Sequence, residues 1–466
     1  MSEPKLPEGP RTLPLLQKIQ WFTKPLDFLE TCAQRYGDIF TVRLNSGSAP
    51  RVFISNPQAI QEIFTADPKQ LDSGNSEGSD PGLLGRYSLL ALSGEQHRRQ
   101  RKLLTPTFHG QRMLAYGQLI RDITLAVTSR WTIGEPFSVR SSMQEISFEV
   151  ILKAVFGLED SPRYEQLKER LIAILNPTRS LWRTVLFLLP SWLRNWGPWS
   201  LRRRLMRQQQ AIDELIYAEI AERRLNLDPS RSDILTLMIL ARDEAGESMT
   251  DVELRDELIT LLVAGHETTA TSLAWALYCI HLRSEVREKL LQELDALGEN
   301  PDPKDILQLP YLNAVCQETL RIYPVGIFAL ARVVKSPLQI GGYQFEPGTR
   351  LFPCIYLTHH RQELYPEPDL FKPERFESRQ FSPYEYLPFG GGNRRCIGMA
   401  FAQFEMKLVL AAVLSRWQMA LADSKPEQPL GGSLLLRPKD GVRMVVTGMR
   451  LQDRRLLQGV SSGLSR

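Results

Sequence analysis

The sequence predicts a mainly α-helical protein with a smaller β part. Residues 57–297 carry apolar side chains at helical spacing over most of their length. Short alternating segments rich in β-branched and aromatic residues lie before and after this span. A glycine-rich loop with one cysteine precedes the last long apolar helix. These observations together predict a helical body with β strands near both ends of the chain.

The composition is that of an ordinary globular protein. The chain has 466 residues with 43% hydrophobic and 24% charged side chains. It has no linker, low-complexity stretch or internal repeat, so we expect one domain over residues 1–466, with its β-rich part in residues 36–60, 325–355 and 430–448. The formal net charge is only +4, and no zinc-finger spacing or basic stripe occurs, so nucleic acid is not an expected partner.

The five cysteines are scattered and form no C-x-x-C pair. This pattern argues against a disulfide scaffold or a zinc site, and it favours a reducing compartment. The N-terminus has no apolar signal stretch, and no run is long enough to span a bilayer. We therefore expect a cytoplasmic protein.

The N-terminal elements are predicted from local pattern. Residues 1–24 are interpreted as a proline-rich lead-in, and residues 25–36 as a short amphipathic helix. Residues 39–44 and 51–55 alternate in polarity and flank a turn sequence, which predicts a β-hairpin.

The longest helix is predicted to begin near Thr250 and to extend for about thirty residues, at ~1.5 Å per residue. Thr250 and Glu253 have the spacing of a capping box. Another helix is expected over residues 311–323. Short strands follow at residues 338–340, 343–345 and 350–353. A glycine pair at residues 431–432 and the alternating segment 442–447 predict a terminal β-hairpin.

The run from Phe389 to Gly398 is the most informative part of the chain. Cys396 lies at the start of a helix, where the backbone N–H groups and the helix dipole favour a thiolate. Three glycines before it allow a flat, bulky partner to approach the backbone. Arg394 can neutralise an anionic group on that partner. Haem, which is flat and anionic and accepts a thiolate as axial ligand, has these properties.

The spacing Phe-x-x-Gly-x-Arg-x-Cys-x-Gly resembles the haem-binding signature of the cytochrome P450 family, the haem-thiolate monooxygenases. The resemblance implies the fold of that family, with a long central helix over the haem. It also implies haem b (iron protoporphyrin IX) with Cys396 as its axial ligand, and Phe389, Arg394 and Gly398 in the cofactor site. Two other interpretations are a phosphate loop, which lacks its Lys-Ser/Thr ending here, and a packed core thiol.

The segment Ala264-Gly-His-Glu-Thr-Thr269 of the long helix resembles the oxygen-activating segment of the family. Ala264 and Thr268 share one helix face, and a small residue beside a hydroxyl leaves room for a cofactor. Gly265 costs ~1 kcal/mol relative to alanine, and such unfavourable choices often mark functional sites. The resemblance implies that Thr268 and Glu267 are catalytic and guide protons during oxygen activation. The alternative is ordinary helix packing.

Basic residues elsewhere are candidates for binding the haem propionates. His97 and Arg101 resemble the His-x-x-x-Arg pair of bacterial members, and Arg332 matches the arginine after the Glu-x-x-Arg helix. With Arg394 they complete the predicted cofactor set. The basic cluster at residues 98–102 has two other interpretations, a solvated face and a docking surface for an acidic electron donor.

Glu318 and Arg321 resemble the Glu-x-x-Arg element of the family, and Arg375 supplies its third member. We expect a buried structural network outside the catalytic set, because buried charges persist only when they are mutually paired. The alternative is a surface bridge that contributes ~0.2–0.5 kcal/mol.

The resemblance covers nearly the whole chain. It is strongest to soluble bacterial, particularly cyanobacterial, members related to long-chain fatty-acid hydroxylases, as residues 103–109 indicate. It implies insertion of one oxygen atom of O2 into a C–H bond of an apolar substrate, such as a long-chain fatty acid, alkane or terpene. Electrons are expected from a separate ferredoxin-type donor with its reductase, and the chain is expected to be a monomer. The tryptophan-rich segment 181–200 is interpreted as a substrate mouth, a weak membrane-surface contact or a packed helix pair.

Three alternatives to a monooxygenase remain open: a peroxide-driven peroxygenase, a hydroperoxide isomerase or dehydratase, and a non-catalytic haem sensor or ligand-binding protein. Peroxygenases of the family lack the acid–alcohol pair that Glu267 and Thr268 represent. The isomerases usually lack the threonine. No appended output domain supports a sensor.

Overall fold

The computed structural model describes residues 6–44, 49–72, 82–108, 111–157, 162–175, 201–298, 300–430 and 435–450. The chain divides into two compact units. Unit 1 comprises residues 1–75, 108–147 and 266–466, and unit 2 comprises residues 76–107 and 148–265. Helices α6 (Val139–Phe156) and α12 (Asp251–Leu282) contribute residues to both units. Within the described ranges, every helix is too short or too polar to span a lipid bilayer.

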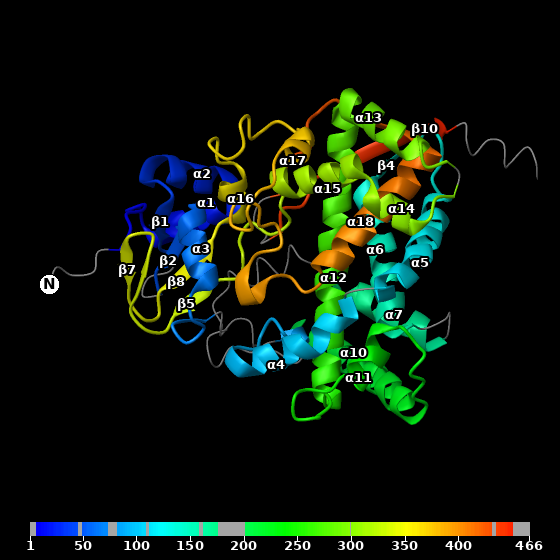
Figure 1. Cartoon of the computed structure of the whole chain (residues 1–466), viewed down its shortest axis with the longest axis horizontal. Coiled ribbons are helices and arrows are strands. Elements are labelled where there is room, and N and C mark those ends of the chain that lie inside the picture. The colour runs from blue at the N-terminus through cyan, green and yellow to red at the C-terminus, as the bar shows by residue number, and fades with distance from the viewer. Residues whose placement is uncertain are drawn as a thin grey trace, which may run out of the picture. The chain divides into compact units, whose positions relative to one another are not determined.

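Unit 1 contains a five-stranded sheet with the strand order β1-β2-β8-β5-β3 (Figure 1). Its strands are β1 (Ile39–Val42), β2 (Arg51–Ile54), β3 (Leu71–Asp72), β5 (Arg332–Val334) and β8 (Arg350–Pro353). The predicted hairpin is confirmed, because β1 and β2 pair antiparallel. Strand β8 then pairs parallel to β2. Helix α3 (Pro57–Thr65) packs its buried Ile60 and Ile63 into the same apolar core as Val52 and Leu351.

The other strands form two smaller sheets in unit 1. Strands β6 (Leu338–Ile340) and β7 (Tyr343–Phe345) have the predicted bounds, and they pair antiparallel. Strand β10 (Arg443–Met449) lies between β4 (Pro136–Ser138) and β9 (Trp417–Leu421). The predicted terminal strand is present as β10, although it pairs with β4 and β9. Pro429 and Pro438 pair antiparallel on the two sides of the predicted turn, whose residues 431–434 lie outside the described residues. The pairing of β10 with β9 is stabilised by buried side chains on both strands, and it cannot be predicted from turn residues next to β10.

The N-terminal helices correct one prediction and confirm another. Helix α2 (Pro25–Tyr36) has the predicted bounds, but residues 1–24 are not all a lead-in, because α1 (Pro14–Thr23) lies within them. Proline at the first helical position is compatible with a helix, since that N–H has no partner in the helix. Tertiary contacts then hold this short helix: Trp21 stacks on Phe53 and Phe328.

Helix α18 (Met399–Arg416) follows the cysteine loop, as predicted, and packs against four helices of unit 1 (Figure 1). These are α5 (Gln111–Thr128), α13 (Ser284–Asp295), α14 (Pro303–Gln308) and α15 (Pro310–Ile322). Buried side chains of α18 such as Phe404 and Leu408 form this interface. The short helices α16 (Ile355–His359) and α17 (Glu374–Ser378) lie between β8 and the loop in sequence.

Unit 2 is helical in its described residues. Its own helices are α4 (Gly94–Leu104), α7 (Pro162–Leu175), α10 (Leu201–Leu225) and α11 (Ile234–Leu240). Helix α12 begins with the predicted capping box: the Glu253 N–H donates to Thr250 Oγ1 at 3.3 Å, and the Thr250 N–H donates to Glu253 Oε2 at 2.8 Å. In unit 1 the same helix is fixed by Trp275, whose ring stacks on Tyr323 with centroids 3.8 Å apart.

Glu405 is a buried acid on the inner face of α18. Burial raises its pKa to about 8, and the neighbouring Ser147 hydroxyl offsets part of this effect. The folded protein therefore holds this carboxyl protonated at neutral pH, whereas the unfolded chain ionises it above its ordinary pKa of about 4.5. The free energy of unfolding therefore falls as the pH rises from about 4.5, the pKa in the unfolded chain, to about 8, the pKa in the folded protein.

Glu405→Gln is expected to stabilise the protein by about 3 kcal/mol at pH 7, and by less than about 1 kcal/mol at pH 5. Glutamine keeps the shape of the protonated acid and removes the ionisation that favours the unfolded state. Denaturant midpoints at the two pH values measure the difference. Glu346→Gln, at an exposed glutamate, is the control. An equal gain at both pH values would contradict the expectation.

Candidate active site

Cys396 lies directly before α18, and its thiol is exposed. The backbone N–H of Cys396 donates to the Phe389 carbonyl at 2.9 Å, which closes the loop between the two residues. The other four cysteines are buried: Cys32, Cys279, Cys316 and Cys354. Burial raises the pKa of each of these four thiols. Cys396 is thus the accessible sulfur, and its place before a helix N-terminus favours the thiolate.

The glycines of the loop serve two different purposes. A Cβ on Gly391 would lie 2.2 Å from the Phe64 ring, and one on Gly392 would lie 2.8 Å from the Phe64 carbonyl oxygen. Gly390 and Gly392 also have φ values of 66° and 64°, a region that favours glycine. These residues therefore let the loop pack directly on α3. A Cβ on Gly398, in contrast, would meet no atom within 4 Å, so space for a partner remains there.

Two buried arginines lie together beside the loop. Arg332 donates to the Leu330 carbonyl at 2.6 Å and to the Gly391 carbonyl at 3.1 Å. Burial and the charge of Arg394 lower the pKa of Arg332 to about 10. Asp72 is the acid nearby, 3.7 Å from Arg394. Among the described residues, these two buried guanidinium groups adjoin one carboxylate, an arrangement that suits an anionic group such as a haem propionate.

The structure places His97 and Arg101 in unit 2, on one face of α4, where His97 is buried and Arg101 is half-buried. It places Phe389, Arg394, Gly398 and Arg332 around Cys396 in unit 1. Asp72 and Phe64 also lie beside the cysteine loop, and neither was predicted from the sequence. No motif marks them, because they reach the loop only through the packing of β3 and α3.

The middle of α12 has an accessible face. Ala264 is exposed and Thr268, one turn later, is half-buried, whereas most neighbouring positions of the helix are buried. Packing explains the glycine at position 265, because a Cβ there would lie 3.0 Å from the Ile151 side chain. Ala264 and Thr268 were predicted to share one helix face with room beside it, and the exposure of both residues is compatible with that arrangement.

Glu267 is held by two residues of α6. Arg140 forms an ion pair with Glu267 Oε1, and Gln144 Nε2 donates to Glu267 Oε2 at 2.7 Å. Both members of the ion pair are largely buried, with side-chain exposures of 13% and 17%. The acid beside Thr268 is therefore a clamped carboxylate. Sequence reasoning missed this clamp because Arg140 and Glu267 lie far apart in the chain.

The predicted network of Glu318, Arg321 and Arg375 is present and buried. Arg321 donates to both carboxylate oxygens of Glu318, at 2.7 and 2.9 Å, and Arg375 Nε donates to Glu318 Oε1 at 3.1 Å. Both Glu318 and Arg321 have 0% side-chain exposure. The alternative of a surface bridge is thereby excluded.

His359 connects this network to the cysteine loop. Arg321 Nη1 donates to the His359 carbonyl at 2.9 Å, and the Leu387 N–H donates to His359 Nε2 at 3.0 Å. Burial and the charge of Arg321 lower the pKa of His359 well below its ordinary value, so the ring is neutral and Nε2 can accept. Leu387 lies two residues before Phe389, where the loop begins.

The basic cluster at residues 98–102 is largely neutralised within unit 2. Arg99 pairs with Asp243 at 2.6 Å and with Glu253 at 2.8 Å, and Lys102 pairs with Glu244. A docking surface for an acidic protein requires uncompensated positive charge. These pairs reduce the uncompensated charge of Arg99 and Lys102, and the docking surface stays a prediction.

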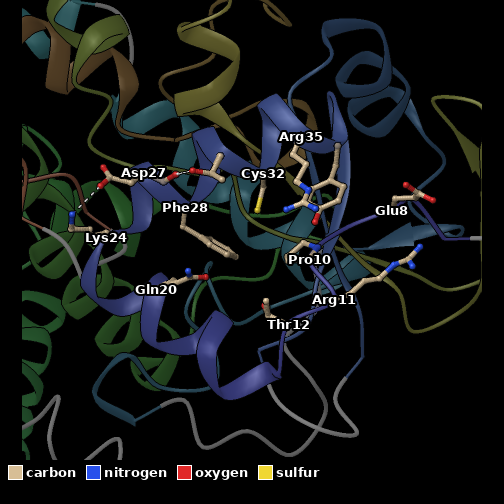
Figure 2. A pocket seen from close by; sticks show the side chains of 12 residues that line it. Glu8, Pro10, Arg11, Thr12, Gln20, Lys24, Asp27, Phe28, Cys32 and Arg35 are labelled. Atoms are coloured by element: carbon tan, nitrogen blue, oxygen red, sulfur yellow. Dashed lines mark hydrogen bonds and ion pairs between the residues drawn. The ribbon is translucent and has the colours of Figure 1, made fainter.

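Two further interpretations concern substrate. Ile327 is buried in the core of unit 1, and the half-buried Phe328 packs against that core and stacks on Trp21. The tryptophan-rich segment 181–200 lies outside the described residues. A cavity of about 790 Å³ lies between α1, α2 and the chain before them, and it includes none of the predicted site residues (Figure 2).

Comparisons with known proteins identify the family of this chain. A family model described as Cytochrome P450 matches residues 7–445. Putative cytochrome P450 135B1 of Mycobacterium tuberculosis is 38% identical over 446 residues, which cover 96% of this chain and 92% of that protein. Putative cytochrome P450 135A1 of the same species is 33% identical over 457 residues, which cover 98% and 97%. The solved structure of cyanobacterial CYP120A1 with retinoic acid bound matches with a TM-score of 0.80 and 26% identity, covering 96% of this chain and 100% of that one.

The residues present fit the prosthetic group that this family uses. An exposed thiol lies at a helix start, open space adjoins Gly398, and two buried arginines offer positive charge for a carboxylate. The predicted fold is confirmed by the similarity to the solved structure. The chain therefore belongs to the cytochrome P450 family, monooxygenases that hold haem through an axial cysteine thiolate.

Proposed function

We propose that this chain hydroxylates a long apolar molecule, with Cys396 as the axial ligand and electrons from a separate ferredoxin-type donor. The exposed thiol of Cys396 in front of α18, backed by Arg332 and Arg394, is the observation that carries the proposal. Haem, when bound, supplies the redox chemistry that reduces O2 and inserts one of its oxygen atoms into a C–H bond.

The residues of unit 1 have distinct tasks in this proposal. The thiolate of Cys396 would bind the iron of the haem and supply it with electron density, and the helix dipole of α18 favours the thiolate form. Arg332 and Arg394 would bind a carboxylate of the cofactor and fix its orientation. His97 and Arg101 of unit 2 are proposed to bind propionate as well.

Thr268 and Glu267 are proposed to supply the two protons that turn the second oxygen atom into water. Thr268 carries its hydroxyl on the accessible face of α12, where Oγ1 can hold a proton close to the reacting oxygen. Arg140 and Gln144 each contact one oxygen of the Glu267 carboxylate, and we propose that they hold this acid in place beside Thr268.

Thr268→Ala is expected to retain haem but to divert most electrons to hydrogen peroxide, lowering the yield of product per electron pair about tenfold or more. Without the hydroxyl, no group on this face positions the proton. The ratio of product formed to reductant consumed measures the effect. Thr271→Ala, at a buried threonine of the same helix, is the control. Unchanged coupling in the Thr268 variant would contradict the assigned role.

The substrate class that we propose is a long apolar molecule such as a fatty acid, an alkane or a terpene. The bound retinoic acid of the similar cyanobacterial structure supports this class. A titration with retinoic acid, palmitic acid, an alkane and a monoterpene, followed by the haem spin-state shift, tests the proposal. A shift with small polar compounds and none with these four would contradict it.

Peroxide provides a second test of the reaction class. Hydroxylation that requires O2, reductant and a ferredoxin supports a monooxygenase. Equal product from hydrogen peroxide alone, without reductant, would favour the peroxygenase alternative, and haem binding without turnover would favour a sensor.

A further inference from the structure

A cavity of about 250 Å³ lies between four helices of unit 1, which are α5, α13, α14 and α18. We call it the α5–α18 cavity, because residues of these two helices form much of its lining. Helices α5, α13 and α14 all pack on α18 (Figure 1). The cavity includes none of the residues assigned to the haem site. Side chains ordinarily fill the space between packed helices, so an open space of this size requires an explanation.

Small side chains on one face of α18 leave the α5–α18 cavity open. Ala411, Ala412 and Ser415 all line it, and none of them is long enough to reach across to α5. On the α5 side, a Cβ on Gly117 would lie 2.7 Å from the Pro303 side chain of α14. The glycine therefore lets α5 and α14 approach each other closely, while the small residues of α18 leave the space beside them unfilled.

The inner wall of the cavity is apolar. Leu294, Ile306 and Leu408 line it, and none of the three is more than 6% exposed. An apolar cavity excludes water and accepts an apolar molecule of matching size. A water molecule takes ~30 Å³, and a methylene group is of similar size, so the cavity has room for a chain of about eight carbon atoms.

The rim of the cavity is positively charged. Arg121 of α5 and Arg416 of α18 are half-buried and line it, and none of the described lining residues is acidic. Arg121 donates to Oδ1 of Asn300, which is a neutral acceptor, and within the described residues it has no ion pair. The acid that follows Leu294 in the chain, Asp295, is paired with Arg450 at 2.7 Å. This distribution of charge favours an anionic group beside Arg121.

We propose that the α5–α18 cavity binds a small apolar carboxylate, with its hydrocarbon chain against the inner wall and its carboxylate at Arg121. The planar guanidinium of arginine matches the two oxygens of a carboxylate. A neutral apolar molecule would leave Arg121 without an anion, and an inorganic anion would leave the apolar wall uncovered. This binding site is separate from the haem site and does not depend on the proposed function.

Equilibrium dialysis of the haem-loaded protein with radiolabelled octanoate tests this proposal. Ala412→Phe places a ring in the cavity and is expected to abolish binding there. Arg121→Gln is expected to weaken binding about tenfold, because a charge-assisted hydrogen bond is lost. The neutral analogue octanol should bind the wild type about tenfold more weakly than octanoate, and its binding should not change in the Arg121→Gln variant.

Two matched substitutions outside the cavity are the controls. Ala126→Phe adds the same ring at an exposed alanine of α5, and Arg130→Gln removes an exposed arginine that pairs with Glu145. Both variants should bind octanoate like the wild type. Unchanged haem absorbance verifies that each variant is folded. If Ala412→Phe prevents folding, the comparison of Arg121→Gln with Arg130→Gln still decides the outcome.

The haem spectrum separates this site from the substrate site. Octanoate bound beside the haem shifts its spin state, whereas octanoate in the α5–α18 cavity leaves the spectrum unchanged. Ala412→Phe should therefore lose one bound molecule per chain and keep any spin shift that the wild type shows. Wild-type protein that binds no octanoate beyond the molecule responsible for a spin shift would overturn the proposal. Equal binding of octanoate by the wild type and the Arg121→Gln variant would overturn it as well.

Discussion

Cys396→Ser is expected to abolish the red-shifted Soret band that marks a thiolate ligand in the reduced carbon monoxide complex. A serine hydroxyl does not ionise near neutral pH, even at a helix N-terminus, so it cannot donate charge as the thiolate does. Hydroxylation should fall below detection for the same reason. The spectrum of the reduced protein before and after addition of carbon monoxide measures the change directly.

The buried cysteines provide the control for this substitution. Cys32→Ala removes a thiol whose pKa burial raises to about 11, and the protein should keep the thiolate-type band. Haem content measured separately distinguishes a lost ligand from lost cofactor. A thiolate-type band that survives in Cys396→Ser would show that another sulfur binds the metal and would falsify the proposed site.

The cysteine loop could be predicted because its information is local. Ten consecutive residues encode the thiol, the helix start, the arginine and the glycines, and the structure gives each glycine a contact or a space that requires it. Helix and strand bounds were accurate for the same reason, for example in α2 and in strands β6, β7 and β8. Period, capping residues and turn residues are short-range signals.

The surroundings of the loop could not be predicted, because they depend on packing between distant segments. Asp72 reaches Arg394, and Arg140 reaches Glu267, only after the sheet and helices have assembled. Strand β9 was missed because it continues from α18 without a turn signal. Helix α1 was missed because the prolines before it and Pro14 at its start resembled a lead-in. The sequence also showed a basic cluster around Arg99 without the acids that neutralise it.

Glu318→Ala is expected to cost about 3–5 kcal/mol of unfolding free energy and to yield little haem-loaded protein. The substitution leaves Arg321 fully buried without its carboxylate, and burial of an unpaired charge is strongly unfavourable. It also removes the acceptor for the Lys372 N–H, which lies 2.9 Å from Glu318 Oε1. Denaturant unfolding and the ratio of haem to protein after purification measure the two effects.

Two comparisons separate a buried network from a general loss of charge. Glu363→Ala removes an exposed partner of Arg361 and should cost no more than about 1 kcal/mol. Glu318→Met with Arg321→Met removes both charges and should restore much of the stability lost in Glu318→Ala, because no unpaired charge remains.

Haem loading in the double variant tests whether the network also positions the cysteine loop. Arg321 holds His359 through its carbonyl, and His359 accepts the Leu387 N–H just before the loop. Methionine cannot replace the donor to His359, so stability should recover further than haem retention does. Equal recovery of both would show that the network stabilises unit 1 without orienting Cys396. Recovery of stability alone would indicate that the hydrogen bonds from Arg321 through His359 hold the loop in the shape that the cofactor requires.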